Sequence, residues 1–166
     1  DGTEECSNNL TVQNQAPTHD SPLLNATDPN NKTSENLTVY NISTADADEE
    51  TVKNIVNWYR DGHSIAVLNM PFEEVDELTS MRSKDYSGYG NNGTVSEAIW
   101  DRTAGYDGRG AYEFDGTNDK ITVSADPSID MYGNEELTIA VWVYPDIAMT
   151  DTYGRIVDKC PDEDYV

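Results

Sequence analysis

The chain has 166 residues, which is enough for one large domain or two small ones. Its 32 acidic side chains outnumber the 10 basic ones and give a net charge of −22. This charge argues against nucleic-acid binding, because phosphate groups would be repelled. No run of about 20 apolar residues that could span a membrane occurs in the sequence.

Residues 1–18 are polar and have no sustained apolar period, so we expect a linker there. Five of the six Asn-x-Ser/Thr sequons lie within residues 1–43, which is more than the local composition gives by chance. The candidate glycosylation sites are Asn9, Asn25, Asn31, Asn36, Asn41 and Asn92. This excess favours glycosylation outside the cell over a merely polar tract, and many archaeal surface proteins are similarly acidic and rich in sequons.

Residues 19–66 predict a small β module. The pair Asp61-Gly62 separates two apolar runs and is a strong signal for a hairpin turn. The three predicted strands are residues 37–41, 53–60 and 64–68. Their order resembles the short immunoglobulin-like β-sandwich modules of microbial surface proteins. An acidic loop at residues 46–50 takes part in this resemblance, but it has Glu49 where the usual loop has Gly. The module is also only about half as long as a full sandwich.

Residues 67–166 predict further strands. Apolar side chains alternate in residues 110–114 and 121–123, and Asp115-Gly116 supplies a turn between these two predicted strands. Residues 137–144 are apolar on both faces, which predicts a central, buried strand with Trp142 in the core.

These strands, the stretch 85–95 and the predicted strand 155–159 together resemble the laminin-G-like (concanavalin-A-like) jelly-roll family. The resemblance covers residues 67–166 and leaves room for little more than half of such a domain. We therefore expect an all-β chain, in which the immunoglobulin-like module precedes an incomplete antiparallel jelly-roll sandwich. The chain is expected to be a mature product or a fragment of a longer protein.

Members of the jelly-roll family are usually non-catalytic modules of secreted or surface proteins, and they bind glycans or proteins, often with Ca²⁺. Hard cations prefer oxygen ligands from loops. The candidate ligands are Asp115, Asn118 and Asp119 around one turn, with Asp85 from a neighbouring loop. The alternative is that Asp115 and Asn118 only stabilise their own turn through hydrogen bonds to the backbone.

Aromatic side chains in predicted loops are candidates for ligand binding, because such rings suit sugar faces and protein contacts. These candidates are Tyr86, Tyr89, Trp100 and Tyr106. The alternative is that the tyrosines only decorate the surface.

The other reactive residues point to no chemistry of their own. Cys6 and Cys160 are disulfide candidates, either with each other or with cysteines elsewhere, and their spacing is not that of a metal site. Neither His19 nor His63 lies near a catalytic motif.

We therefore expect an extracellular, cell-surface protein that is not an enzyme and that binds a glycan or a surface protein, with Ca²⁺ as a candidate cofactor. One alternative is a structural subunit of a glycosylated surface layer or filament, which assembles through open sheet edges. Another is an accessory binding domain of a secreted hydrolase.

Overall fold

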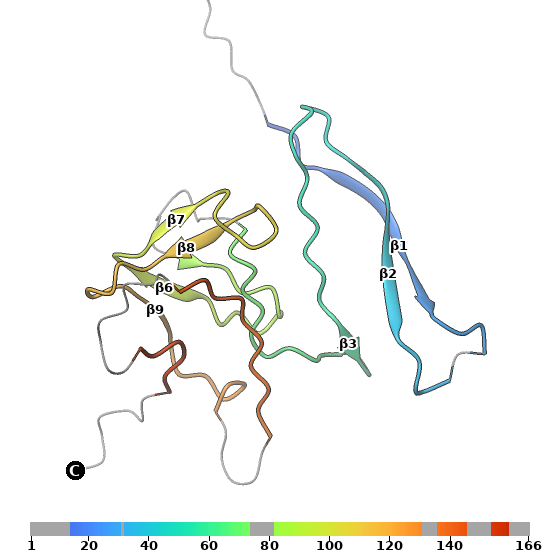
Figure 1. The fold of residues 1–166 in the computed structure, drawn as a ribbon. Helices are drawn as coiled ribbons and strands as arrows, with labels where there is room; N and C mark the ends of the chain where they lie inside the picture. Colours follow the sequence, from blue (N-terminus) through green and yellow to red (C-terminus); the bar gives the residue numbers. More distant parts are fainter. Residues whose placement is uncertain (1–13, 31, 74–81, 131–135, 146–153, 160–166) are drawn as a thin grey trace, which may run out of the picture. The chain divides into compact units, whose positions relative to one another are not determined.

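The computed structural model describes residues 14–30, 32–73, 82–130, 136–145 and 154–159. Within these ranges it contains nine β-strands and no helix, and strands make up 30% of the residues (Figure 1). The chain is therefore mostly β, as the sequence predicts, although the described strands form four small sheets and do not show a sandwich or a jelly roll. Contacts divide the chain into Asp1–Ile129 and Asp130–Val166, so the boundary predicted between residues 66 and 67 lies inside the first unit.

The longest element is an antiparallel hairpin of β1 (Thr18–Ala26) and β2 (Leu37–Ala45) (Figure 1). The sequence predicts β2, although only to residue 41, and it does not predict β1. The register shifts between Thr18 and Asp20 and again between Asp20 and Leu23, and Pro22 lies in the second of these intervals. A proline has no N–H to donate and therefore interrupts the regular pairing and the apolar alternation on which the prediction depends.

A second, very short hairpin confirms the predicted turn. β3 (Tyr59–Arg60) pairs with β4 (His63–Ser64) across Asp61-Gly62. The φ angles of Asp61 and Gly62 are 53° and 82°, which is the left-handed backbone of a type I′ turn. The predicted strands 53–60 and 64–68 were too long, because only these four residues form strands. One more bond, from the Ile65 N–H to the Trp58 carbonyl (2.8 Å), extends the pairing.

A three-stranded antiparallel sheet holds the small apolar core of the first unit. Its strands, in spatial order, are β5 (Arg82–Ser83), β6 (Gly93–Ser96) and β9 (Lys120–Val123). Val95 on β6 is buried and pairs with Ile121 on β9. The side chains of Ile121 and Met70 lie close over Gly93, where a β-carbon would meet them at 2.5 and 3.2 Å.

A further hairpin of β7 (Ile99–Asp101) and β8 (Ala111–Glu113) pairs Trp100 with Tyr112. The predicted strands 110–114 and 121–123 are thus confirmed in position as β8 and β9. Their pairing across the Asp115-Gly116 turn was wrong, since β8 pairs with β7 and β9 with β6. Sequence alternation marks a strand but carries no information on which strand lies next to it.

The prediction of a buried central strand at residues 137–144 was wrong. No strand is assigned there, and Trp142 is 78% exposed. Residues 155–159 likewise form no strand and are exposed. A segment that is apolar on both faces needs strands beside it and layers above and below, and the described residues of the second unit supply no strand for it.

Candidate functional site

The best-built feature of the described structure is the loop that follows β5, which is organised by one buried carboxylate. Asp85 is only 7% exposed. Its Oδ1 accepts hydrogen bonds from the backbone N–H groups of Asn69 (2.9 Å) and Ser87 (2.8 Å). Its Oδ2 accepts from the N–H of Asn91 (2.9 Å) and the hydroxyl of Ser87 (2.6 Å). One side chain thus fixes two backbone positions of the loop, at Ser87 and Asn91, and ties the loop to Asn69.

These bonds also determine the charge state of Asp85. Burial alone would raise the pKa of the carboxyl group, because it disfavours the charged form. The hydrogen bonds from the Ser87 hydroxyl and from the backbone of Asn69, Ser87 and Asn91 favour the charged form, and together they lower the pKa below its ordinary value of 3.8. The carboxylate is therefore charged at neutral pH although it is buried.

Other residues of this loop are also tied to segments that are distant in sequence. Asn91 donates from its amide to the Val67 carbonyl (2.9 Å) and to the Ser128 hydroxyl (2.8 Å). Asn57 donates to the Ser87 carbonyl (2.9 Å), so the segment before β3 holds the loop from another direction. We call residues 85–92 the Asp85 loop.

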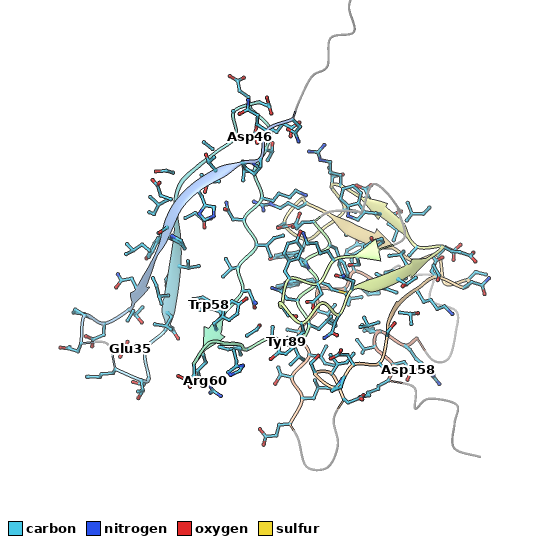
Figure 2. All side chains as sticks on the ribbon, turned by 180° about the vertical axis from the view of Figure 1, so that it is seen from behind. Glu35, Asp46, Trp58, Arg60, Tyr89 and Asp158 are labelled. Atoms are coloured by element: carbon cyan, nitrogen blue, oxygen red, sulfur yellow. The ribbon has the colours of Figure 1, made fainter. Side chains whose placement is uncertain are left out.

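Two tyrosines lie at the outside of the Asp85 loop. Tyr89, labelled in Figure 2, is 44% exposed, and its N–H donates to the Ser87 hydroxyl (3.2 Å). The hydroxyl of Tyr59, from β3, lies 3.5 Å from the position of a β-carbon built on Gly88. Tyr59 is also exposed. The hydrogen-bonded loop thus exposes the side chain of Tyr89, and the exposed Tyr59 of β3 lies close to Gly88 of the same loop.

The other three aromatic residues that the sequence predicts to bind a ligand lie in different surroundings. Tyr86 is half-buried, and the Lys84 ammonium lies 4.6 Å from its ring centre. Trp100 was placed in a loop by the sequence but lies in β7, where its indole N–H donates to the Phe72 carbonyl (2.7 Å). Tyr106 is exposed in the loop between β7 and β8. Tyr89 and Tyr106 are thus exposed, whereas Tyr86 and Trp100 are half-buried.

The predicted calcium ligands are divided between two places. In the turn after β8, Asp119 Oδ2 accepts from the Asp115 N–H (2.6 Å), and Asp115 Oδ1 accepts from the Thr117 N–H (2.6 Å). Asn118 lies in the same turn with a φ of 68°. Among the residues that the structure describes, no three carboxylate, histidine or cysteine side chains are grouped as a metal site would require. Asp85 therefore does not join the other two aspartates.

Four of the six sequon asparagines lie in the described residues, and all four are exposed: Asn25, Asn36, Asn41 and Asn92. Asn92 is the last residue of the Asp85 loop, and its side-chain oxygen accepts a hydrogen bond from the Asp85 N–H (2.9 Å). Asn9, Asn31, Cys6 and Cys160 lie outside the described residues, so their predicted roles stay predictions.

Sequence reasoning missed the residues that hold the Asp85 loop in place by hydrogen bonds, which are Ser87 and Asn91 within the loop and Asn57 and Asn69 outside it. The spacing Asp85-Tyr86-Ser87 was a usable signal, because aspartate often accepts a hydrogen bond from the N–H two residues later. The bonds to Asn57, Asn69 and Val67 depend on the folded chain and have no counterpart in local sequence.

A scan against protein-family models and searches of curated proteins and solved structures found no match to this chain. The described residues contain no helix that could cross a membrane.

Proposed function

We propose that this chain is an extracellular, non-catalytic recognition module that binds a glycan or a surface protein. The observation that carries the proposal is the Asp85 loop, which is held by buried hydrogen bonds, exposes Tyr89 and has the exposed Tyr59 close to its Gly88. Aromatic side chains on a rigid support bind with little loss of conformational entropy, and tyrosine combines an apolar ring with a polar hydroxyl. The net charge of −22 makes nucleic acid an unsuitable partner.

The laminin-G-like kinship is part of this proposal. It is supported by the stretch 85–95, which forms the Asp85 loop and β6, and by β8 and β9 at the predicted positions. A complete jelly-roll sandwich would require residues 137–144 to gain partner strands. The immunoglobulin-like interpretation of residues 19–66 is supported by the two hairpins β1–β2 and β3–β4.

Tyr89→Ala should abolish most binding to a glycan or surface-protein ligand found by array screening, with a loss of about tenfold or more in affinity, since exposed aromatic anchors carry much of the binding energy. The measurement is calorimetry or surface plasmon resonance on the folded variant. Tyr144→Ala is the matched control, because Tyr144 is fully exposed outside this loop. Equal affinity of the Tyr89 variant and the native chain would remove this loop from the binding site.

A structural subunit of a surface layer is the second candidate, and one observation favours it. Leu137, Ile139, Val141 and Val143 are all about half exposed, although residues 137–144 as a whole have the pattern of a strand covered on both faces. Neighbouring copies could supply the missing cover by adding strands. A discrete monomer by native mass measurement argues against this candidate, and ordered polymers in electron micrographs argue for it.

Calcium at the turn of Asp115, Asn118 and Asp119 is the proposed cofactor. The hydrogen bonds described above use one oxygen of each aspartate and leave a second oxygen of each outside those bonds. Added Ca²⁺ should raise the melting temperature by about 2 °C or more, because a ligand that binds only the folded state stabilises it. A melting curve that is the same with excess Ca²⁺ and with chelator would remove the metal from the proposal. If Ca²⁺ does raise the melting temperature, Asp115→Asn should abolish that rise.

A further inference from the structure

The register of the β1–β2 hairpin places a sequon asparagine on the same face as two exposed apolar side chains. Leu23 pairs with Tyr40, and Asn25 pairs with Thr38. Residues that pair directly across an antiparallel ladder project from the same face, and so do residues two apart on one strand. Leu23, Asn25, Thr38 and Tyr40 therefore share one face, which we call the Tyr40 face.

The Tyr40 face is open to solvent, since all four of its residues are exposed, Leu23 to 55% and Tyr40 to 50%. The opposite face carries Leu24, Ala26, Leu37 and Val39, of which Ala26 and Val39 are half-buried. Figure 2 shows side chains along the hairpin between its two ends, which are marked by Glu35 and Asp46. An isolated two-stranded hairpin is marginally stable in water, so a partner that covers this face would stabilise it.

We propose that an N-linked oligosaccharide on Asn25 covers the Tyr40 face, with the C–H face of its first sugar stacked on the ring of Tyr40. The inference rests on the proposed extracellular location. Asn25 and Tyr40 are diagonal neighbours on the ladder, at a separation of about 7–8 Å or slightly less between their β-carbons, which a sugar ring can bridge. The occupant is therefore attached to the face that it covers, and no separate partner is required.

The attachment is ordinary N-glycosylation by a transferase of the secreting cell. The Asn25 amide nitrogen forms a bond to C1 of the sugar, and the bond from C1 to the phosphate oxygen of a lipid-linked oligosaccharide breaks. The amide loses one proton, and the lipid phosphate leaves with the electron pair of the broken bond. Oxidation states do not change.

The two other described sequons of the hairpin are suited to serve as controls. Asn41 projects on the face of Val39, where both residues line a hollow together with residues 54–57. Asn36 lies at the end of the hairpin, where its backbone N–H and carbonyl both bond to Thr27. Because the Thr27 hydroxyl makes these bonds, the sequon of Asn25 is best removed by Asn25→Gln and not by a change at Thr27.

The test uses the full chain secreted from insect cells, with site occupancy read by glycopeptide mass spectrometry. Asn25 should be modified, and Asn25→Gln should speed amide hydrogen exchange in β2 roughly fivefold, the size of one aromatic contact. Asn41→Gln should leave that exchange unchanged. In the glycosylated chain, NMR should show upfield ring-current shifts of first-sugar protons, and these shifts should vanish in Tyr40→Leu.

Three results would overturn the inference. If other sequons are occupied and Asn25 is not, or if Asn25 carries a sugar without ring-current shifts or protection of β2, the packing is wrong while the extracellular glycoprotein proposal stands. If no sequon is occupied in the secreted chain, the glycoprotein part of the proposed function falls and the inference falls with it.

Discussion

Asp85→Ala should lower the free energy of unfolding by about 4 kcal/mol, because it removes a charged acceptor from four donors at once. Three of these donors are backbone N–H groups that are fixed by the chain, and water would have to enter to satisfy them. Since small domains are stable by only about 5–15 kcal/mol, the variant should be close to unfolding. Urea denaturation followed by tryptophan fluorescence measures the change.

Asp101→Ala is the matched control for this prediction. Asp101 accepts from the N–H and hydroxyl of Thr103, as Asp85 does from Ser87, but Asp101 is only half-buried, whereas Asp85 is buried. Its loss should change stability much less than the loss of Asp85. Similar effects of the two substitutions would show that the buried network around Asp85 is not a main source of stability.

The pH dependence of the same carboxylate gives a second measurement. The pKa of Asp85 is lower in the folded chain than its ordinary value of 3.8, so the unfolded chain binds the proton more readily. The stabilisation by the charged form is therefore fully present well above pH 3.8 and is lost as the pH falls below that value through the lower folded pKa. The difference in melting temperature between the native chain and Asp85→Asn should shrink over this acidic range and stay constant from pH 5 to 8.

The sequence predicted those parts of the fold that depend on a few adjacent residues. The Asp61-Gly62 turn is correct because both residues tolerate the positive φ angles that a type I′ turn imposes. β8 and β9 were located by their alternating side chains, but their partners are β7 and β6. Partner choice depends on packing between distant segments, which local alternation does not encode.

Residues 137–144 also show that a local pattern does not determine the contacts between distant segments. Their apolar pattern predicts a covered strand, and the pattern alone does not reveal whether the chain supplies the cover. At the candidate site, the sequence singled out Asp85 and Tyr89 but assigned Asp85 to a metal. Its four donors include the N–H of Asn69, 16 residues away, and the N–H of Asn91, 6 residues away. Only the folded chain brings these groups together.

Gly110→Ala should destabilise the β7–β8 hairpin region by about 3 kcal/mol, at the upper end of what overpacking costs. A β-carbon on Gly110 would lie 2.1 Å from the Phe72 carbonyl oxygen and 3.0 Å from the Trp100 indole nitrogen. The oxygen belongs to the backbone, so it moves only if the chain moves with it. The substitution should therefore break the 2.7 Å hydrogen bond from Trp100 to Phe72 and shift the edge-on contact of Phe72 with Tyr112. Thermal melts and the fluorescence of Trp100 report both changes.

Gly108→Ala separates this steric effect from the general effect of losing a glycine. Gly108 has a φ of 76° and nothing within 4 Å of a β-carbon, so alanine there meets backbone strain of about 1 kcal/mol but no clash. Gly110 shows the reverse combination, because its φ angle lies outside the left-handed region but other atoms already occupy the space that a β-carbon would need. If Gly110→Ala were as mild as Gly108→Ala, the close packing of Phe72, Trp100 and Gly110 would be wrong, and with it the position of β8 beside the segment that leads from Asn69 to Phe72.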